Sequence, residues 1–117
     1  MKIREILEYI DAEVLIGEEH MEEEIEYGWS CDLMSDVLAF VKNNVILLTG
    51  LIHPQVIRTA EMLDIKAIAF VRGKIPGEEI LRMAKSRDMV VLATKHSLFT
   101  SSALLHEKGL IGEDCTR

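Results

Sequence analysis

Cysteine is scarce in this chain, with two residues of this type among 117. Cys31 and Cys115 stand in neither a CxxC nor a zinc-type spacing, and one pair does not make a disulfide framework in a domain of this size. A fold held together by several disulfides or by a structural zinc ion is therefore excluded. The chain has to be stabilised by an apolar core.

Aromatic residues are also few, at 5% of the chain. Hydrophobic residues nevertheless make up 49% and charged residues 28%, which is the composition of a globular protein. The core is therefore expected to be aliphatic, and such cores are typical of parallel sheets covered by helices. The length fits one domain, which we expect to span residues 1–117.

Long apolar runs are absent, and none approaches the length of a membrane-spanning helix. The first five residues begin an amphipathic helix and are not followed by the apolar core of a signal peptide. We therefore expect no membrane partner and a cytoplasmic location.

Basic residues are in deficit: 13 Lys and Arg stand against 20 Asp and Glu, which gives a net charge of −7. Proteins that bind the nucleic-acid backbone need a basic face, so nucleic acid is not an expected partner. The acidic residues are concentrated between Glu18 and Glu26, whereas the stretch from Arg58 to Lys95 is closer to balanced. A small anionic ligand in a local pocket is compatible with this charge distribution.

A strand followed by a helix recurs through the second half of the chain. Three continuous apolar runs, typical of strands buried on both faces, lie at residues 45–48, 67–71 and 90–93. Pro54 begins the first following helix, Pro76 precedes the second, and Ser97 or Thr100 caps the third, which Gly109 ends. Such units require parallel pairing through right-handed crossovers. We predict an α/β protein with three α/β/α layers and a parallel or mostly parallel sheet of about five strands.

The first half is less regular. Apolar spacing predicts a helix over residues 3–10, a strand over 12–17 and a short second strand over 25–27. A further helix is expected over residues 32–42, with Asp32 or Ser30 as its N-cap. This helix is apolar around more than one stripe, which leaves Met34 and Leu38 as candidate interface residues. It is either deeply buried within its own subunit or part of a homodimer interface.

Candidate ligand-binding residues follow the three regular strands. In open α/β sheets ligands bind beyond the carboxyl ends of the strands, and three loops are expected to meet there. The candidates in these loops are Thr49, Gly50, His53, Arg72, Gly73, Lys74, Thr94, Lys95, His96 and Ser97. Hydroxyls, glycines and cationic groups ahead of helix N-termini suit a phosphate or a carboxylate. Alternatively, these residues only turn the chain, satisfy backbone groups and face solvent.

Catalytic and metal sites find little support in the sequence. His53 and His96 could hold a metal or shuttle protons if they met, but no third ligand with metal spacing is near, so no metal is predicted. Cys31 precedes a predicted helix N-terminus, where thiols can become reactive, yet no base is in view. Dinucleotide, phosphate-loop and hydrolase-elbow motifs are all missing. We therefore expect no catalytic residue, no enzyme activity and no cofactor.

Three segments resemble a stand-alone DRTGG domain. They are residues 31–40, residues 48–50 together with 53–60, and residues 67–73. The resemblance implies a three-layer α/β/α fold similar to the N-terminal domain of HPr kinase/phosphorylase, frequent dimerisation, and a regulatory or assembly role. His53-Pro54 stands in place of the Asp-Arg pair of the motif that names the family, so the resemblance assigns no ligand-binding residue.

Three functional hypotheses follow. The first is a non-catalytic regulatory module that forms a homodimer and binds a small anionic ligand, with a nucleotide as one candidate, or a partner protein that it regulates. The second is a small enzyme in which His53, His96 or Cys31 acts as acid, base or nucleophile. The third is a purely structural subunit of a larger complex.

Overall fold

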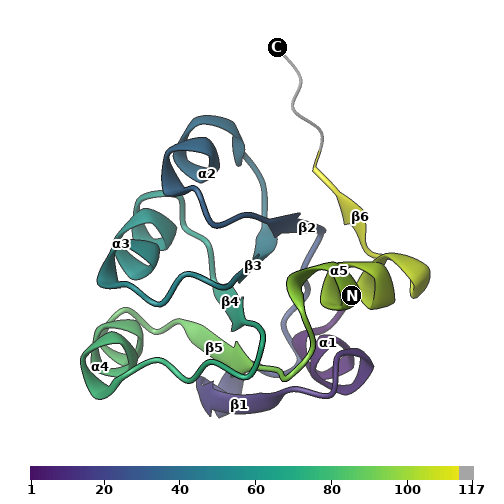
Figure 1. The fold of residues 1–117 in the computed structure, drawn as a ribbon, viewed down its shortest axis with the longest axis horizontal. Coiled ribbons are helices and arrows are strands. Elements are labelled where there is room, and N and C mark those ends of the chain that lie inside the picture. Colours follow the sequence, from purple (N-terminus) through teal and green to yellow (C-terminus); the bar gives the residue numbers. More distant parts are fainter. Residues whose placement is uncertain (114–117) are drawn as a thin grey trace.

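The structure is a computed structural model that describes residues 1–113, in which helices and strands alternate (Figure 1). The helices are α1 (Ile3–Tyr9), α2 (Met34–Phe40), α3 (Pro54–Met62), α4 (Glu78–Ser86) and α5 (Leu98–Glu107), with a short 3-10 helix, η1 (Glu18–His20). The strands are β1 (Glu13–Ile16), β2 (Tyr27–Ser30), β3 (Val45–Thr49), β4 (Ala67–Phe70), β5 (Val90–Ala93) and β6 (Ile111–Gly112). Within this described part of the chain, no helix is long and apolar enough to cross a membrane.

The strands form one sheet in the order β1-β5-β4-β3-β2-β6. Neighbouring strands are parallel except β1, which runs antiparallel to β5. The predicted mostly parallel sheet is confirmed, and β6 adds a short edge strand to the five expected. The register pairs Thr49 of β3 with Phe70 of β4, and Phe70 with Ala93 of β5. The loops that follow these three strands therefore leave the same edge of the sheet.

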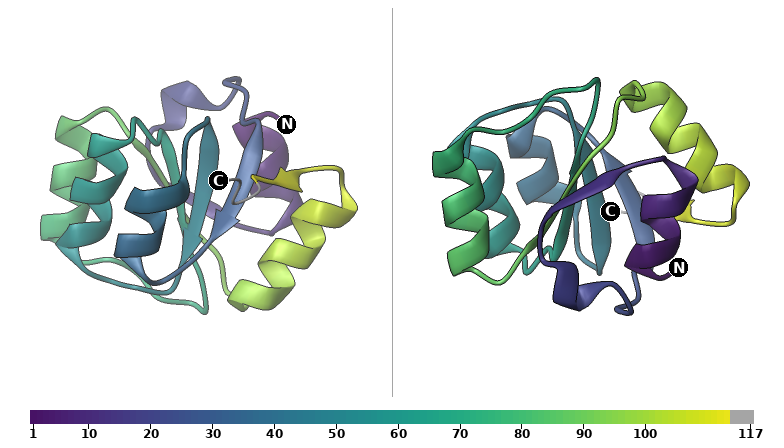
Figure 2. Two further views of the ribbon diagram at one scale, coloured as in Figure 1. Left: turned by 90° about the horizontal axis from the view of Figure 1, so that it is seen from above. Right: turned by 90° about the horizontal axis from the view of Figure 1, so that it is seen from below.

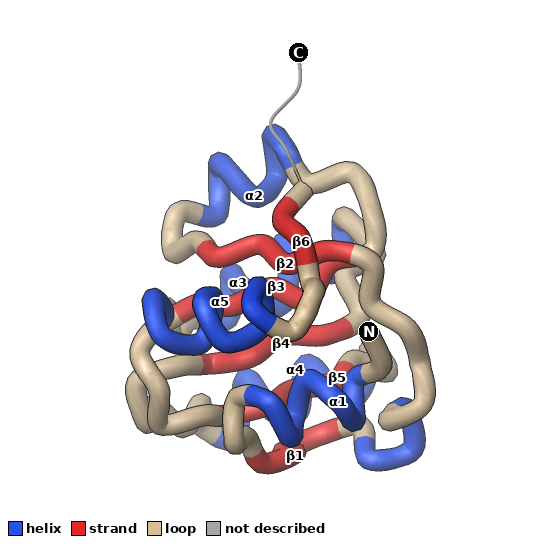
Figure 3. The backbone as a smooth tube through the Cα atoms, turned by 90° about the vertical axis from the view of Figure 1, so that its right-hand side faces the viewer, coloured by secondary structure: helices blue, strands red, loops and turns tan. Residues whose placement is uncertain are grey.

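Helices cover both faces of the sheet, which confirms the three-layer prediction (Figures 1 and 2). α2, α3 and α4 lie on one face, and α1 and α5 lie on the other, where Figure 3 shows them in front of the strands. β3, β4 and β5 are buried along their whole length. Because successive side chains of a strand face opposite ways, Leu47 joins the core beneath α2, α3 and α4, whereas Leu48 joins the core beneath α1 and α5.

The region around β2 differs from the prediction. Ser30 was one candidate for the N-cap of the next helix, but Ser30 and the preceding Trp29 belong to β2, because both pair with residues of the buried strand β3. The helix that follows is shorter than residues 32–42: α2 has seven residues, and Leu33 is its N-cap without a side-chain hydrogen bond. The prediction that Asp32 or Ser30 caps this helix is wrong. Asp32 instead accepts a hydrogen bond from the end of β3.

The two candidate interface residues on α2 have different surroundings. Met34 is 3% exposed and packs in the core on the α2 face of the sheet. Contrary to the prediction, it is not available to a partner, because α2 turns this side chain toward the sheet. Leu38 is 43% exposed, and Leu33 just before the helix is 57% exposed. Of the two predicted interface residues, only Leu38 is therefore exposed, and Leu33 adds a second exposed apolar side chain beside it.

Candidate functional site at the carboxyl edge of the sheet

Backbone hydrogen bonds join the loops that follow β4 and β5. The N–H of Arg72 donates to the carbonyl of His96 at 2.8 Å, and the N–H of Gly73 donates to the carbonyl of Thr94 at 3.0 Å. Sequence reasoning placed both loops at one edge of the sheet, and these bonds show that they touch. The candidate residues on the two loops are thus held in fixed relation to each other.

Asp32 connects the loops that follow β3 and β4. Its Oδ1 accepts hydrogen bonds from the Thr49 hydroxyl at 2.8 Å and from the N–H of Gly50 at 2.7 Å. The Nζ of Lys74 donates to the carbonyl of Gly50 at 3.0 Å. The Arg72 guanidinium lies against the same glycine, since a Cβ built on Gly50 would come within 2.6 Å of an Arg72 nitrogen. We call these five residues the Asp32 cluster.

The electrostatics of the Asp32 cluster favour an ionised carboxylate. Burial by itself would raise the pKa of Asp32. The hydrogen bonds from Gly50 and Thr49, helped by the positive charges of Arg72 and Lys74, outweigh this effect and lower the pKa below its ordinary value. At neutral pH the cluster therefore combines two cations with one carboxylate. This local excess of positive charge, in an acidic protein, is able to attract an anion.

The turn after β4 positions the Arg72 side chain. Arg72 has a φ of 63° and Gly73 a φ of 71°. A non-glycine residue in this left-handed region is uncommon and is retained where the surrounding structure holds it. The backbone bonds to the β5 loop provide that support. Around Gly73 no atom lies within 4 Å of a Cβ position, so glycine is favoured there by its backbone conformation and not by lack of space.

A separate hollow of about 570 Å³ lies beside the end of β5. Gly73, Thr94 and Lys95 help to line it, together with Asp11 from the turn after α1 and Glu13 at the start of β1. The Thr94 hydroxyl is already engaged, because it donates to the backbone carbonyl that ends α1 at 2.7 Å. Two acidic side chains beside one lysine make this hollow less suited to an anion than the Asp32 cluster.

Two of the candidate residues act as helix caps. Nδ1 of His53 accepts from the N–H of Gln55 at 3.0 Å at the start of α3, and Oγ of Ser97 accepts from the N–H of Thr100 at 3.1 Å at the start of α5. α3 and α5 cover opposite faces of the sheet (Figure 2). The loops that carry His53 and His96 therefore lead to opposite sides of the sheet. Neither histidine belongs to a group of three potential metal ligands within residues 1–113.

Cys31, the candidate nucleophile of the enzyme hypothesis, lies between β2 and α2. Its thiol donates to the carbonyl of Leu33 at 3.3 Å. The thiol proton is thus directed to the backbone and not to a general base. Cys115 lies outside the described residues.

Asp32 is the site residue that sequence reasoning missed. Its position before an apolar helical segment is typical of an N-cap, and that interpretation conceals its contacts with β3. The signal that could have revealed it is the extent of β2. Once this strand reaches Ser30, Asp32 follows a strand end, as Gly50 and Arg72 do.

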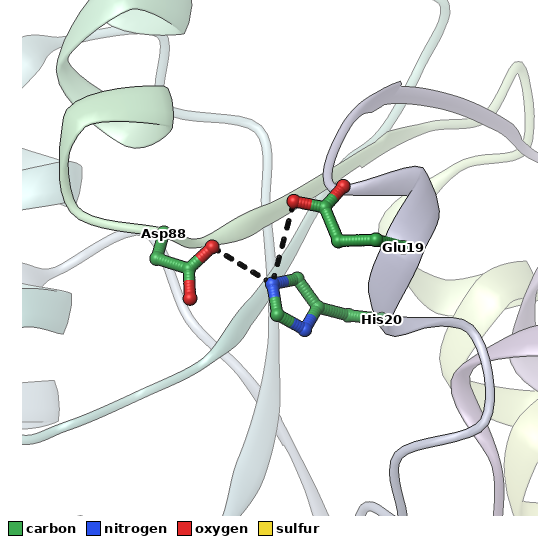
Figure 4. A group of neighbouring side chains, drawn as sticks. All are labelled: Glu19, His20 and Asp88. Atoms are coloured by element: carbon green, nitrogen blue, oxygen red, sulfur yellow. Dashed lines mark hydrogen bonds and ion pairs between the residues drawn. The ribbon is translucent and has the colours of Figure 1, made fainter.

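A cluster of charged residues ties η1 to the turn before β5. Nε2 of His20 lies 2.8 Å from Oδ1 of Asp88 and 3.7 Å from Oε2 of Glu19 (Figure 4), and Nδ1 contacts Glu23. The bond to Asp88 raises the pKa of His20; burial opposes this, and Glu23 adds to it. The ligand atoms of Glu19, His20 and Asp88 are close enough to hold a metal ion. However, the Lys66 ammonium lies 3.6 Å from Asp88 and already offsets the negative charge, so we interpret the cluster as a structural ion-pair network.

Comparisons with known proteins give a fold relationship. No family model matches the chain, and no curated protein matches it. Among solved structures, the chain is similar to the CBS and DRTGG domains of the regulatory region of a Clostridium perfringens pyrophosphatase, crystallised with its activator diadenosine tetraphosphate. This chain shares its fold with part of a regulatory region. The TM-score is 0.71 with 22% identity, over 89% of this chain and 45% of that one. This chain thus spans about half the length of its structural neighbour.

Proposed function

We propose that residues 1–117 form a non-catalytic regulatory domain of the DRTGG type that binds a small anionic ligand at the Asp32 cluster. The observation that carries this proposal is the convergence of Arg72 and Lys74 on the loop after β3, at the edge where α/β sheets bind ligands. The neighbouring structure supports a phosphate-bearing ligand, because that regulatory region was crystallised with a nucleotide activator. A nucleotide is therefore the first candidate. The similarity to HPr kinase/phosphorylase stays a prediction.

The cluster offers distinct contacts to such a ligand. The Arg72 guanidinium can donate two parallel hydrogen bonds to phosphate oxygens, and Lys74 can add a point charge. Asp32 keeps the Thr49–Gly50 backbone in place through Oδ1. Its second oxygen can accept a hydrogen bond from a ligand hydroxyl, such as those of a ribose. The carboxylate also repels the phosphate, so that it limits affinity while it selects for a hydroxyl-bearing anion.

Thermal-shift titration tests the ligand. Phosphate, AMP, ATP and diadenosine tetraphosphate are each titrated against the purified chain, and a ligand at 100 times its dissociation constant should stabilise the fold by about 2.7 kcal/mol. Arg72→Ala and Lys74→Ala should each abolish the stabilisation. Arg58→Ala, which removes the same charge from an exposed position on α3, should leave it unchanged. Flat melting curves for all four compounds, or equal loss in all three variants, would reject the anion site and leave regulation through a partner protein.

We also propose that the domain forms a homodimer through the outer surface of α2. The exposure of Leu38 and Leu33 supports this interface, since a hydrophobic surface of this kind is shielded by association. Sedimentation velocity measures whether the wild type and the Leu38→Glu variant are monomers or dimers. A dimer that Leu38→Glu converts to a folded monomer is the expected result. A wild type that stays monomeric at high concentration contradicts the proposal.

A further inference from the structure

A hollow of about 460 Å³ lies between α5 and the β2–β6 edge of the sheet. Its apolar walls come from Leu48, Leu105, Leu110 and Phe99, and Gly28 of β2 leaves its floor without a side chain. None of the Asp32 cluster lines it. The arrangement of helices accounts for this space: among residues 1–113, α2, α3 and α4 cover one face of the sheet, whereas α1 and α5 cover the other, where they lie in front of the strands in Figure 3. The volume falls within the range of small-molecule sites.

Hydrogen-bond accounting defines the polar group at one end of the hollow. The Ser102 hydroxyl donates its one proton to the carbonyl of Leu98 at 2.8 Å. The Ser30 and Ser102 oxygens lie 2.6 Å apart, so Ser30 must be the donor in that pair. The Ser30 oxygen, whose proton is used in this bond, can then only accept a further hydrogen bond. A ligand that contacts Ser30 must therefore supply a donor. The carboxylate of Glu107, which also lines the hollow, is a second acceptor.

The mouth of the hollow carries exposed apolar side chains. Phe99 is 83% exposed and Ile111 is 55% exposed, although both line the hollow. An aromatic ring placed inside would contact Phe99 in a stacked or edge-on arrangement. A Cβ on Gly28 would lie 3.4 Å from the Leu110 side chain, so a larger residue at position 28 would take up space in the hollow. The contact with Phe99 makes the hollow better suited to a flat aromatic ring than to a branched aliphatic group.

We propose that this hollow is a second ligand site, for a flat apolar ring that carries one N–H or O–H donor. The donor bonds to Ser30, and the ring packs between α5 and β2. The site is independent of the anion site at the Asp32 cluster, with which it shares no residue, so failure of one proposal leaves the other standing. It gives the domain a means to sense a small neutral molecule in addition to an anion.

Indole and benzofuran are the probes, because they have similar size and shape but only indole has an N–H donor. Each is titrated into the ¹⁵N-labelled chain and followed by amide chemical shifts. Indole should shift amides of α5 and β2 and saturate with a dissociation constant on the order of 1 mM. Benzofuran should bind about fivefold more weakly, as expected for the loss of one hydrogen bond. Ser30→Ala should bring indole to the affinity of benzofuran.

A matched pair of variants locates the site. Ala103 is an exposed residue of α5 that lines the hollow, and Ala39 is an exposed residue of α2 that does not. Ala103→Phe should fill the hollow and abolish indole binding, whereas Ala39→Phe should leave it intact; both should melt as folded proteins. Absence of saturable shifts with either probe, equal affinity for both, or indole binding that survives Ala103→Phe would overturn the proposal. A wild-type dimer that Ala103→Phe dissociates would also overturn it, because a second copy would then fill the hollow.

Discussion

Replacement of Asp32 by asparagine should change stability and anion binding in opposite directions. Asparagine keeps the shape and the accepting oxygen that Thr49 and Gly50 contact, and removes the charge. A hydrogen bond to a charged group exceeds a neutral one by about 1 kcal/mol, so two bonds give about 2 kcal/mol. Solvent screening of this exposed carboxylate halves the figure to about 1 kcal/mol. We expect a loss of about 4 °C in melting temperature, measured by differential scanning calorimetry.

The same substitution should strengthen phosphate binding. A unit charge about 6 Å away in a water-like medium contributes about 0.7 kcal/mol, or about threefold in affinity.

The stabilising effect of the Asp32 carboxylate should also depend on pH. Because the pKa of Asp32 is lowered in the folded protein, this effect is present above the ordinary aspartate value of about 3.9 and is lost as the pH falls through the folded-state value. The difference in stability between Asp32→Asn and the wild type should therefore shrink as the pH falls below the ordinary aspartate value and vanish once Asp32 is protonated in the folded state.

Asp36→Asn is the matched control, since it removes an exposed carboxylate from the first turn of α2. It should change stability by less than about 0.5 kcal/mol. Equal effects of Asp32→Asn and Asp36→Asn on stability would refute the role assigned to the two hydrogen bonds. Weaker phosphate binding in Asp32→Asn would refute the electrostatic reasoning about the cluster.

Three further predictions concern the framework. Gly17→Ala should destabilise the fold by about 2–3 kcal/mol in urea unfolding, because φ is 93° and the new Cβ would lie 2.9 Å from the Met89 carbonyl oxygen; an unchanged midpoint would show that the backbone there adjusts freely. The raised pKa of His20 implies stability that is present below its ordinary value of about 6.5 and lost as the pH rises through the folded-state value. The lowered pKa of Asp88 sets the acid limit of this contribution, and His20→Gln should remove the loss on the alkaline side from a series of melting curves. Thr94→Val should cost about 1–2 kcal/mol by leaving a buried carbonyl without its 2.7 Å donor; calorimetry that finds no loss would show that another donor replaces it.

The sheet and its layers could be predicted because the decisive residues are neighbours in sequence. The runs that form β3, β4 and β5 are continuously apolar, and each is followed by a helix. Local residues mark the start of two of these helices: Pro54 for α3 and Ser97 for α5. Periodicity and capping act over a few residues, so a single sequence contains them. The position of the strand-end loops then followed from the geometry of parallel strands.

The structure alone decided how residues distant in the chain combine. Trp29 and Ser30 have no strong strand pattern, and they join β2 because β3 offers a backbone edge for pairing. That extension moves Asp32 from a helix cap to the centre of a cluster with Arg72, forty positions further along the chain. Local sequence determines which segments become strands and helices. Which side chains meet at the edge of the sheet depends on register and helix placement, which are set by packing of the whole core.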